Sequence, residues 1–345
     1  MKVHSGARVA VAGAGALGSA AALRLARAGF AVTVFDPAPL GANASGVAAG
    51  MLAPVSEALF DPASRDHLPL MRRARDLWPA FAEALGLEIV RAGVRIEGSR
   101  AWRDQVGSRL NDLGLSADEA IAEDWRIESR LALEALRAAA AAAGARFEAT
   151  TVESFAPGAL RLADGRTEAF DVLVLATGPG ARDGRLAPET RALAPIKGQI
   201  LRTAALDADQ MVVRGEGVYL APGKTLAVGA TMETGRDDLA PDASATQALR
   251  AAARALRPDL DLDRAQVEVG VRVTTPDGLP LVGWSRAPGV LLAVGARRNG
   301  WLLAPLVADM VAAYLNGDNP GPDAAAMRAR RFEEPEGDKQ ERAGE

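Results

Sequence analysis

Apolar positions near the start of the chain change from a strand period to a helix period and back. Residues 8–12 form an apolar run of strand length, and residues 31–35 form another that ends at Asp36. Between these runs, apolar residues recur at helical spacing at Leu17, Ala21, Leu25 and Ala28. The pattern predicts a strand, a helix, a second strand and an acid, the order of a dinucleotide-binding unit.

A glycine-rich turn joins the first predicted strand to the helix. Gly13 permits a tight turn, Gly15 lets the backbone approach a pyrophosphate, and Gly18 lets the helix lie close to the sheet. The helix N-terminus offers N–H groups to phosphate, and Asp36 would accept hydrogen bonds from ribose hydroxyls. The unit favours NAD or FAD over NADP and leaves the choice between those two open.

A second strand of the same kind lies far along the chain. Residues 172–175 are continuously apolar, as in a central parallel strand buried on both faces, and Thr177 and Gly178 follow in a small-residue turn. Such a turn belongs at the carboxyl edge of the sheet, where cofactors bind in these folds. We therefore expect a nucleotide-binding domain that the chain leaves and later re-enters.

The remaining segments predict a second domain of a different kind. Short strands and turns dominate residues 195–271, within which residues 217–223 and 225–232 are expected to pair as antiparallel strands. Residues 102–124 show no clear period, and the segment from Asp318 is polar and expected to be loose. Helices are predicted at residues 66–85 (kinked at Pro79), 131–143, 244–256 and 300–314.

Together these elements predict an α/β fold: a discontinuous Rossmann-like domain and a substrate domain with an antiparallel sheet. The expected boundaries are residues 1–80, 140–190 and 268–318 for the first domain, residues 81–139 and 191–267 for the second, and residues 319–345 for a polar tail.

Composition narrows the classes of function. The 345 residues suffice for two domains, and a net charge of −4 with dispersed Lys and Arg gives no footprint for nucleic acid or an anionic membrane. The chain has no cysteine and two histidines, so we expect no thiol nucleophile, no cofactor attached through sulfur and no metal site. No stretch is long and uncharged enough to span a bilayer, so a cytoplasmic protein is expected. The sequence leaves open whether the protein forms a homo-oligomer.

Residues 45–54 are unusually rich in small side chains, and Ser45 is a candidate helix N-cap. The segment allows two interpretations, which are close helix packing or a backbone that lies directly along a cofactor. The pattern alone does not choose between them.

Five short motifs then occur in a fixed order. They are Ala-Ala-Gly-Met-Leu-Ala-Pro at 48–54, Pro-Ile-Lys-Gly-Gln at 195–199, Val-Gly-Ala-Thr-Met at 228–232, Thr-Pro-Asp-Gly-Leu-Pro at 275–280 and Arg-Asn-Gly at 298–300. With these motifs the chain resembles the D-amino-acid oxidase superfamily of FAD enzymes, and within it glycine oxidase of the thiamine pathway, from about residue 8 to residue 315. The resemblance implies non-covalent FAD rather than NAD, and cofactor contact for residues 45–54.

The resemblance also implies which residues border FAD. A helix that begins near Asn299 would direct its N–H groups at the pyrimidine edge of the flavin, which becomes anionic on reduction. The cofactor-binding residues expected from the glycine turn, the strand edge and the resemblance are Gly13, Gly15, Ala16, Leu17, Gly18, Asp36, Pro37, Ala44, Ser45, Ala49, Gly50, Met51, Val152, Thr177, Gly178, Ala296, Arg297, Arg298, Asn299, Gly300, Trp301 and Leu302.

For the substrate, the resemblance implies that Arg272 and Arg298 hold a carboxylate, that Tyr219 donates a hydrogen bond, and that Met232 lines the pocket. The residues alone also single out Arg272, because a charge in an apolar strand context needs a partner. The implied reaction is oxidative deamination of glycine, sarcosine or a small D-amino acid to an imine or 2-oxo acid. Dioxygen is the expected acceptor, with hydrogen peroxide as the product.

The chain departs from the family pattern at several positions. Val273 stands where a proline is usual, Arg297 stands where an aromatic residue is common, and the bulky Trp301 follows the Arg-Asn-Gly motif. Arg297 beside Arg298 favours a more acidic substrate. Three alternatives stay open: a D-amino-acid dehydrogenase with an acceptor other than oxygen, a related tRNA-modifying enzyme, and a scaffold that binds a partner without catalysis. The negative net charge of the chain argues against the tRNA-modifying enzyme.

Overall fold

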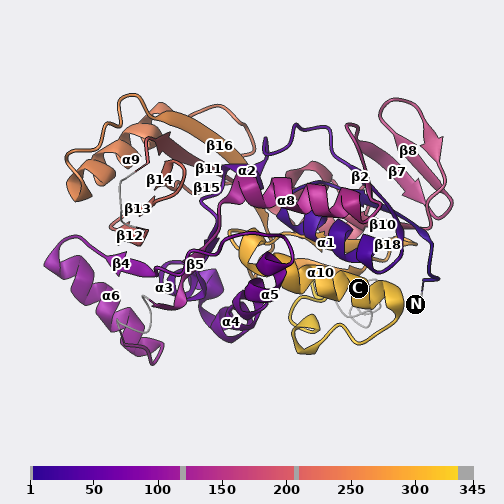
Figure 1. Cartoon of the computed structure of the whole chain (residues 1–345), viewed down its shortest axis with the longest axis horizontal. Coiled ribbons are helices and arrows are strands. Elements are labelled where there is room, and N and C mark those ends of the chain that lie inside the picture. Colours follow the sequence, from indigo (N-terminus) through magenta and orange to yellow (C-terminus); the bar gives the residue numbers. More distant parts are fainter. Residues whose placement is uncertain (1–2, 117–121, 206–209, 333–345) are drawn as a thin grey trace, which may run out of the picture.

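Two β-sheets lie at opposite ends of an elongated molecule, with helices between and around them (Figure 1). The computed structural model describes residues 3–116, 122–205 and 210–332. Among these residues, no helix is long and apolar enough to cross a membrane.

The first sheet is parallel except at one edge, where β17 pairs antiparallel with β18. Its central strands are apolar on both faces, and all four residues of β10 are buried, as the sequence predicts. The chain enters this sheet at three separate places. In spatial order its strands are β17 (Leu281–Trp284), β18 (Val290–Val294), β10 (Val172–Leu175), β1 (Arg8–Ala12), β2 (Ala31–Phe35) and β6 (Arg146–Glu148).

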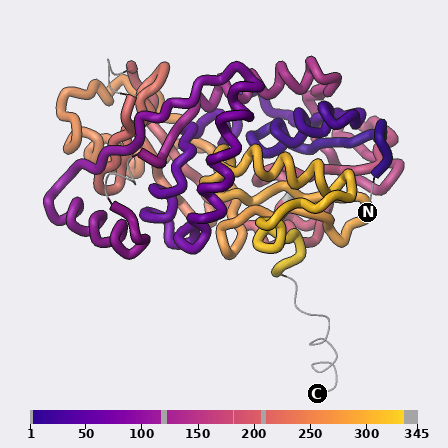
Figure 2. Tube along the Cα trace, turned by 60° about the horizontal axis from the view of Figure 1, so that its bottom comes forward, coloured from indigo at the N-terminus to yellow at the C-terminus, as the bar shows by residue number. Residues whose placement is uncertain are grey.

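Three helices cover one face of this sheet. Helix α1 (Ala16–Arg27) packs against both α8 (Ser129–Ala142) and α10 (Gly300–Asn316), and Figure 2 shows α1 in indigo beside α10 in yellow. Five of the ten buried residues of α1 are alanines, and these small side chains let the neighbouring helices approach closely. This packing holds the N-termini of α1 and α10 close to the carboxyl edge of the sheet.

The second sheet is antiparallel apart from the pairing of β4 with β12. The predicted pairing of residues 217–223 with 225–232 is confirmed by β13 and β14. Helix α9 (Ala243–Leu256) covers one face through Leu249 and Ala253. The strands are β15 (Glu233–Thr234), β11 (Ala194–Thr203), β14 (Leu226–Gly229), β13 (Val218–Ala221), β12 (Val212–Gly215) and β4 (Val94–Ile96), with β16 (Gln266–Thr274) paired to β11.

A helical segment between the two sheets departs from the expected pattern. The predicted helix at 66–85 is interrupted at Leu77, two residues before Pro79, and forms α4 (Leu68–Asp76) and α5 (Trp78–Glu83). Helix α6 (Arg100–Asp112) occupies a region where no element was predicted. Only two of its residues, Val106 and Leu110, are buried, so its sequence carries almost no apolar stripe.

Smaller elements complete the chain. They are α2 (Ala44–Val47), α3 (Pro54–Phe60), a two-stranded sheet of β3 (Met51–Leu52) and β5 (Trp125–Arg126), a three-stranded sheet of β7 (Val152–Ala156), β8 (Ala159–Leu162) and β9 (Thr167–Glu168), and 3-10 turns at Pro62–His67, Gly178–Ala181, Pro188–Ala192 and Pro322–Ala324.

The polar segment after residue 318 is not loose as far as residue 332, which corrects that expectation. Arg73 forms an ion pair with Asp323. Arg331 donates two hydrogen bonds to the carboxylate of Asp277, both at 2.7 Å. The side chain of Met327 is fully buried. Residues 333–345 of the expected tail lie outside the described residues.

Helix α3 is anchored by an acid that lies about 70 positions away in sequence. The two carboxylate oxygens of Asp124 accept hydrogen bonds from the backbone N–H groups of Val55 and Ser56, at 3.0 and 2.9 Å. These N–H groups belong to the first turn of the helix and have no intrahelical acceptor. Burial raises the pKa of Asp124 to about 6, against the opposing effect of these hydrogen bonds.

The close approach at Gly18 gives a first prediction. A Cβ at Gly18 would overlap the carbonyl oxygen of Gly13, whereas a Cβ at Gly107 of α6 meets nothing within 4 Å. We expect Gly18→Ala to lower the free energy of unfolding by about 1–3 kcal/mol or more. The control Gly107→Ala should leave it unchanged or raise it by about 0.5–1 kcal/mol. Urea unfolding measures both, and equal effects would contradict the close approach.

The buried carboxyl of Asp124 gives a prediction about pH. Its folded-state pKa of about 6 exceeds the unfolded value, so the folded protein binds more protons between these two pH values. The stability that this group contributes is therefore full below about pH 4 and is lost as the pH rises through 6. The free energy of unfolding of the wild type minus that of Asp124→Asn should fall by about 2 kcal/mol from pH 4 to pH 7. A constant difference would contradict the assignment.

Candidate active site

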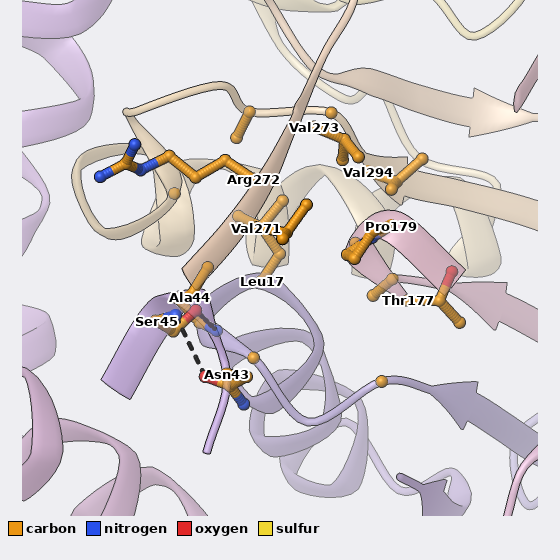
Figure 3. Close-up of a pocket in the computed structure, with 18 of the residues that line it drawn as sticks. Leu17, Asn43, Ala44, Ser45, Thr177, Pro179, Val271, Arg272, Val273 and Val294 are labelled. Atoms are coloured by element: carbon orange, nitrogen blue, oxygen red, sulfur yellow. Dashed lines mark hydrogen bonds between the residues drawn. The ribbon is translucent and has the colours of Figure 1, made fainter. Parts of the chain in front are cut away.

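A cleft runs along the carboxyl edge of the first sheet, bordered by the turn after β1, helix α2, the turn after β10 and strand β16 (Figure 3). The sequence predicts many of the residues that line this cleft. They are Gly13, Gly15, Ala16, Leu17, Asp36, Ala44, Ser45, Thr177, Gly178, Ala296, Arg297, Arg298, Gly300 and Trp301. Arg272, predicted for the substrate, also lines it, as do Ala48 of the small-residue segment and Val273. Residues that the sequence analysis did not name line it as well, namely Asn43, Ala176, Pro179, Val271, Ala293, Val294 and Gly295.

The glycine turn brings three backbone segments into contact at one end of this cleft. Gly13 has φ +102°, and a Cβ there would overlap the carbonyl of Ala176, at the end of β10. Gly18 does not line the cleft, because it lies against the Gly13 carbonyl. The glycine turn, which we call the glycine cradle, can form only because Gly13 and Gly18 have no Cβ. It leaves its backbone exposed to a ligand.

Asp36 closes the turn from the other side. Its carboxylate accepts hydrogen bonds from the backbone N–H groups of Ala14, at 2.7 Å, and Ala38, at 2.9 Å. Asp36 also lines an adjoining cavity together with Pro37, Arg137 and other residues. The position suits the ribose of an adenosine bound across the two cavities.

Helix α2 and the N-terminus of α1 are joined by one serine. The Ser45 hydroxyl oxygen accepts a hydrogen bond from the Ala16 backbone N–H at 2.9 Å. Ser45 is not the N-cap of α2, which corrects that expectation. The cap is Asn43, whose side chain accepts from the N–H groups of Ser45 and Gly46, both at 3.0 Å (Figure 3 draws the first of these bonds).

Helix α10 begins at the cleft, with Asn299 as its N-cap residue. Trp301 lines the cleft and donates from its indole Nε1 to the Ser45 carbonyl at 3.0 Å, which ties α10 to α2. Asn299 and Leu302 are buried and, with Val152 on β7, are expected cofactor residues that do not line the described cleft. The Asn299 side chain instead donates to Ser64, at 3.4 Å.

An inner cavity adjoins the cleft, since Arg272, Arg298 and Trp301 line both. It brings together every residue that the sequence assigned to substrate. Its full lining is Ala48, Ala49, Gly50, Met51, Glu57, Arg214, Tyr219, Ala230, Met232, Arg272, Arg298 and Trp301.

Arg272 is a half-buried cation with no ion-pair partner among the described residues. Its side chain leaves β16 and reaches the end of the cleft remote from Thr177 and Pro179 (Figure 3). Its Nη1 is buried and has no hydrogen-bond partner among the described residues. Gly198 makes room for the guanidinium, because a Cβ there would overlap Nη1. Burial lowers the pKa of Arg272, so the cation is held at a cost that a bound anion would offset.

The positive charges of the other two predicted arginines, Arg297 and Arg298, are neutralised by acids. Arg298 forms an ion pair with Glu57, with two N···O distances of 3.1 Å, and approaches the Met232 sulfur at 3.5 Å. Arg297 donates to Asp61 at 2.6 and 3.0 Å. Its charge is therefore neutralised, and the expectation that Arg297 adds positive charge for an acidic substrate is wrong.

Two charged residues of the inner cavity, Arg214 and Glu57, were missed by the sequence analysis. Arg214 on β12 is buried between the rings of Phe60 and Tyr219, with its Cζ 5.3 and 5.2 Å from the two ring centroids. Its Nη2 lies 3.8 Å from Glu57. The signal that singled out Arg272 also applies here, because Arg214 follows two valines in an apolar strand.

Comparison with known proteins agrees with this geometry. A family model described as FAD dependent oxidoreductase (DAO) matches residues 8–314. A glycine oxidase of Geobacillus kaustophilus is 29% identical and aligns with 94% of this chain and 96% of its own. A bifunctional protein ThiO/ThiG of Trichormus variabilis is 28% identical over 94% of this chain and 55% of its own length.

Solved structures give the same result for the fold. The crystal structure of glycine oxidase from Geobacillus kaustophilus matches with a TM-score of 0.78 and 28% identity, over 94% of this chain and 99% of that one. The predicted α/β fold and the choice of FAD over NAD are confirmed. The glycine cradle, Asp36 and the start of α10 fit that cofactor. The chain belongs to the DAO family of FAD-dependent oxidoreductases.

Proposed function

We propose that the protein oxidises a small amine-bearing acid, such as glycine, sarcosine or a small D-amino acid, to an imine. The single observation that carries this proposal is the Arg272 guanidinium, whose buried Nη1 has no hydrogen-bond partner among the described residues and which lines both the cofactor cleft and the inner cavity. A carboxylate would satisfy its fork through two parallel hydrogen bonds. The glycine oxidase of Geobacillus kaustophilus, similar over nearly its whole length, supports this substrate class.

The inner cavity supplies orientation rather than acid–base chemistry. Arg272 would hold the substrate carboxylate, Tyr219 would donate a hydrogen bond to it, and Met232 would pack against the carbon skeleton. Among the described residues of the lining, Glu57 is the one carboxylate, and it is already engaged in an ion pair with Arg298. The amine would therefore bind in its neutral form, and positioning would provide most of the catalysis.

Cofactor chemistry completes the reaction. Bound FAD would supply a two-electron acceptor for the hydride of the substrate Cα. The neutral amine would thereby become a protonated imine, which would release its proton to solvent. Trp301 and the Gly50 backbone, which line the inner cavity, would keep water from the reacting carbon. The imine product would hydrolyse to a 2-oxo acid or serve the thiazole synthesis of the thiamine pathway, and a relative from Rhizobium etli is named "Putative thiamine biosynthesis oxidoreductase ThiO".

Removing the guanidinium tests the proposed carboxylate anchor. Arg272→Met should raise KM for the best substrate by about 10²-fold or more, because one partner of a buried charge pair is lost. Arg272→Lys keeps the charge without the fork and should lie between the wild type and Arg272→Met. The visible absorbance of FAD should persist in both variants. Steady-state kinetics measures the effect, and an unchanged KM would mean that the anchor is misplaced.

The electron acceptor is tested by two assays on the FAD-loaded enzyme. Anaerobic mixing with glycine, sarcosine, D-alanine and D-proline should bleach the flavin with at least one of them. In air, the same substrate should then produce hydrogen peroxide in an oxygen electrode without an added acceptor. Bleaching without peroxide would favour a dehydrogenase, and no bleaching with any amine would refute the proposed function.

A further inference from the structure

The inner cavity holds more positive charge than one carboxylate requires. Beyond Arg214, it continues into an outer cavity that shares Arg214, Tyr219, Ala230 and Arg298 with it. Among the charged residues that line the two, the acid is Glu57, and the bases are Arg109, Arg214, Arg272 and Arg298. This charge pattern suits an anionic ligand with more than one charge.

Glu57 neutralises the positive charges of the inner cavity unequally. Glu57 makes both of its short contacts, at 3.1 Å, with Arg298. Its distance to Arg214 is 3.8 Å, too long for a hydrogen bond. Glu57 therefore neutralises Arg298, and Arg214 receives a weak share of the same charge.

The Arg214 guanidinium is as poorly satisfied as that of Arg272. Its Nε and Nη2 are buried and have no hydrogen-bond partner among the described residues. The buried Asp124, whose charge also acts on Arg214, has both carboxylate oxygens occupied by backbone N–H groups of α3. The flanking rings of Phe60 and Tyr219 offset part of the cost of burial but supply no hydrogen-bond acceptor in this arrangement.

The two unsatisfied guanidinium groups come from different strands of the same sheet. Arg272 extends from β16, whereas Arg214 lies on β12, directly opposite Tyr219 of β13 in the antiparallel pair. Both line the inner cavity. A substrate held by Arg272 through one carboxylate would therefore have a second cation available further along the cavity.

We propose that Arg214 receives a second carboxylate, so that the preferred substrate is an amine that bears two carboxylates. This inference rests on the proposed function, since it assigns a substrate class to the same site. It differs from the sequence expectation, in which Arg297 supplied the additional charge.

Matched pairs of amines test the inference on the FAD-loaded enzyme. Iminodiacetate is sarcosine with a carboxylate added to its N-methyl group, and D-aspartate is D-alanine with a carboxylate added to its methyl group. Anaerobic flavin reduction should give a kcat/KM at least about tenfold higher for the dicarboxylate in one pair or both, the gain expected from a buried charge pair.

Variants assign this preference to Arg214. Arg214→Met should lower the ratio of dicarboxylate to monocarboxylate kcat/KM by at least about tenfold, and Arg214→Lys should retain part of it. The control is Arg126→Met, because Arg126 is also buried but pairs with Glu128 and Gln210 outside both cavities. The ratio should not change in this control.

Binding of unreactive acids gives a readout that does not need turnover. Diglycolate replaces the amine of iminodiacetate by an ether oxygen, and methoxyacetate is the matching monocarboxylate. In wild-type holoenzyme, perturbation of the flavin absorbance should give a Kd at least about tenfold lower for diglycolate. The gap should close in Arg214→Met, and equal Kd values in the wild type would overturn the inference even if that variant does not fold.

The outcomes separate the inference from the proposed function. Reduction by sarcosine or D-alanine with no advantage for either dicarboxylate overturns the second carboxylate site and leaves amine oxidation standing. A dicarboxylate preference that survives Arg214→Met also overturns the role of Arg214, whose burial would then serve packing with Phe60 and Tyr219 alone. If these four amines, glycine and D-proline all fail to reduce the flavin, both proposals fail.

Discussion

The constraint on which the rest of this structure depends is a half-buried arginine, Arg272, that has no counter-ion in the part of the chain that the structure describes. The Arg272 guanidinium is partly removed from water, and its Nη1 has no hydrogen-bond acceptor among the described residues. Such a group is costly unless a ligand completes it. Gly198 leaves space for it on the neighbouring strand, and its own strand, β16, places it where the cofactor cleft meets the inner cavity. The protein therefore holds a cation ready for an acid that arrives from outside.

Strand β16 connects the two halves of the chemistry. It pairs with β11 along the second sheet, while Val273 near its end packs in the core of the first sheet. The glycine turn at residues 13–18 and the start of α10 complete the cofactor cleft opposite to it. Trp301 and Ser45 then tie α10, α2 and α1 into one frame. A shift in any of these elements would change the distance between the cofactor and the anchored acid.

The sequence predicts the backbone of this site better than its charges. The strand–turn–helix unit at residues 8–36 could be predicted from the hydrophobic period and the spacing of the glycines. A binding role for Arg272 could be predicted because a charged residue stands in an apolar strand. The ion pairs of Arg297 with Asp61 and of Arg298 with Glu57 span more than 200 positions, so no local pattern reveals them. Helix α6 was missed because its exposed residues leave almost no apolar period. Arg214 carried a signal, but its neighbours on α3 became known only from the fold.

A crystal structure of the FAD-loaded enzyme with bound methoxyacetate tests the central claim most directly. The account predicts that both carboxylate oxygens lie within hydrogen-bond distance of the Arg272 guanidinium, with the ether oxygen on the flavin side. A ligand bound elsewhere in the cleft, or an Arg272 side chain turned into bulk water while the ligand is held by other groups, would contradict it.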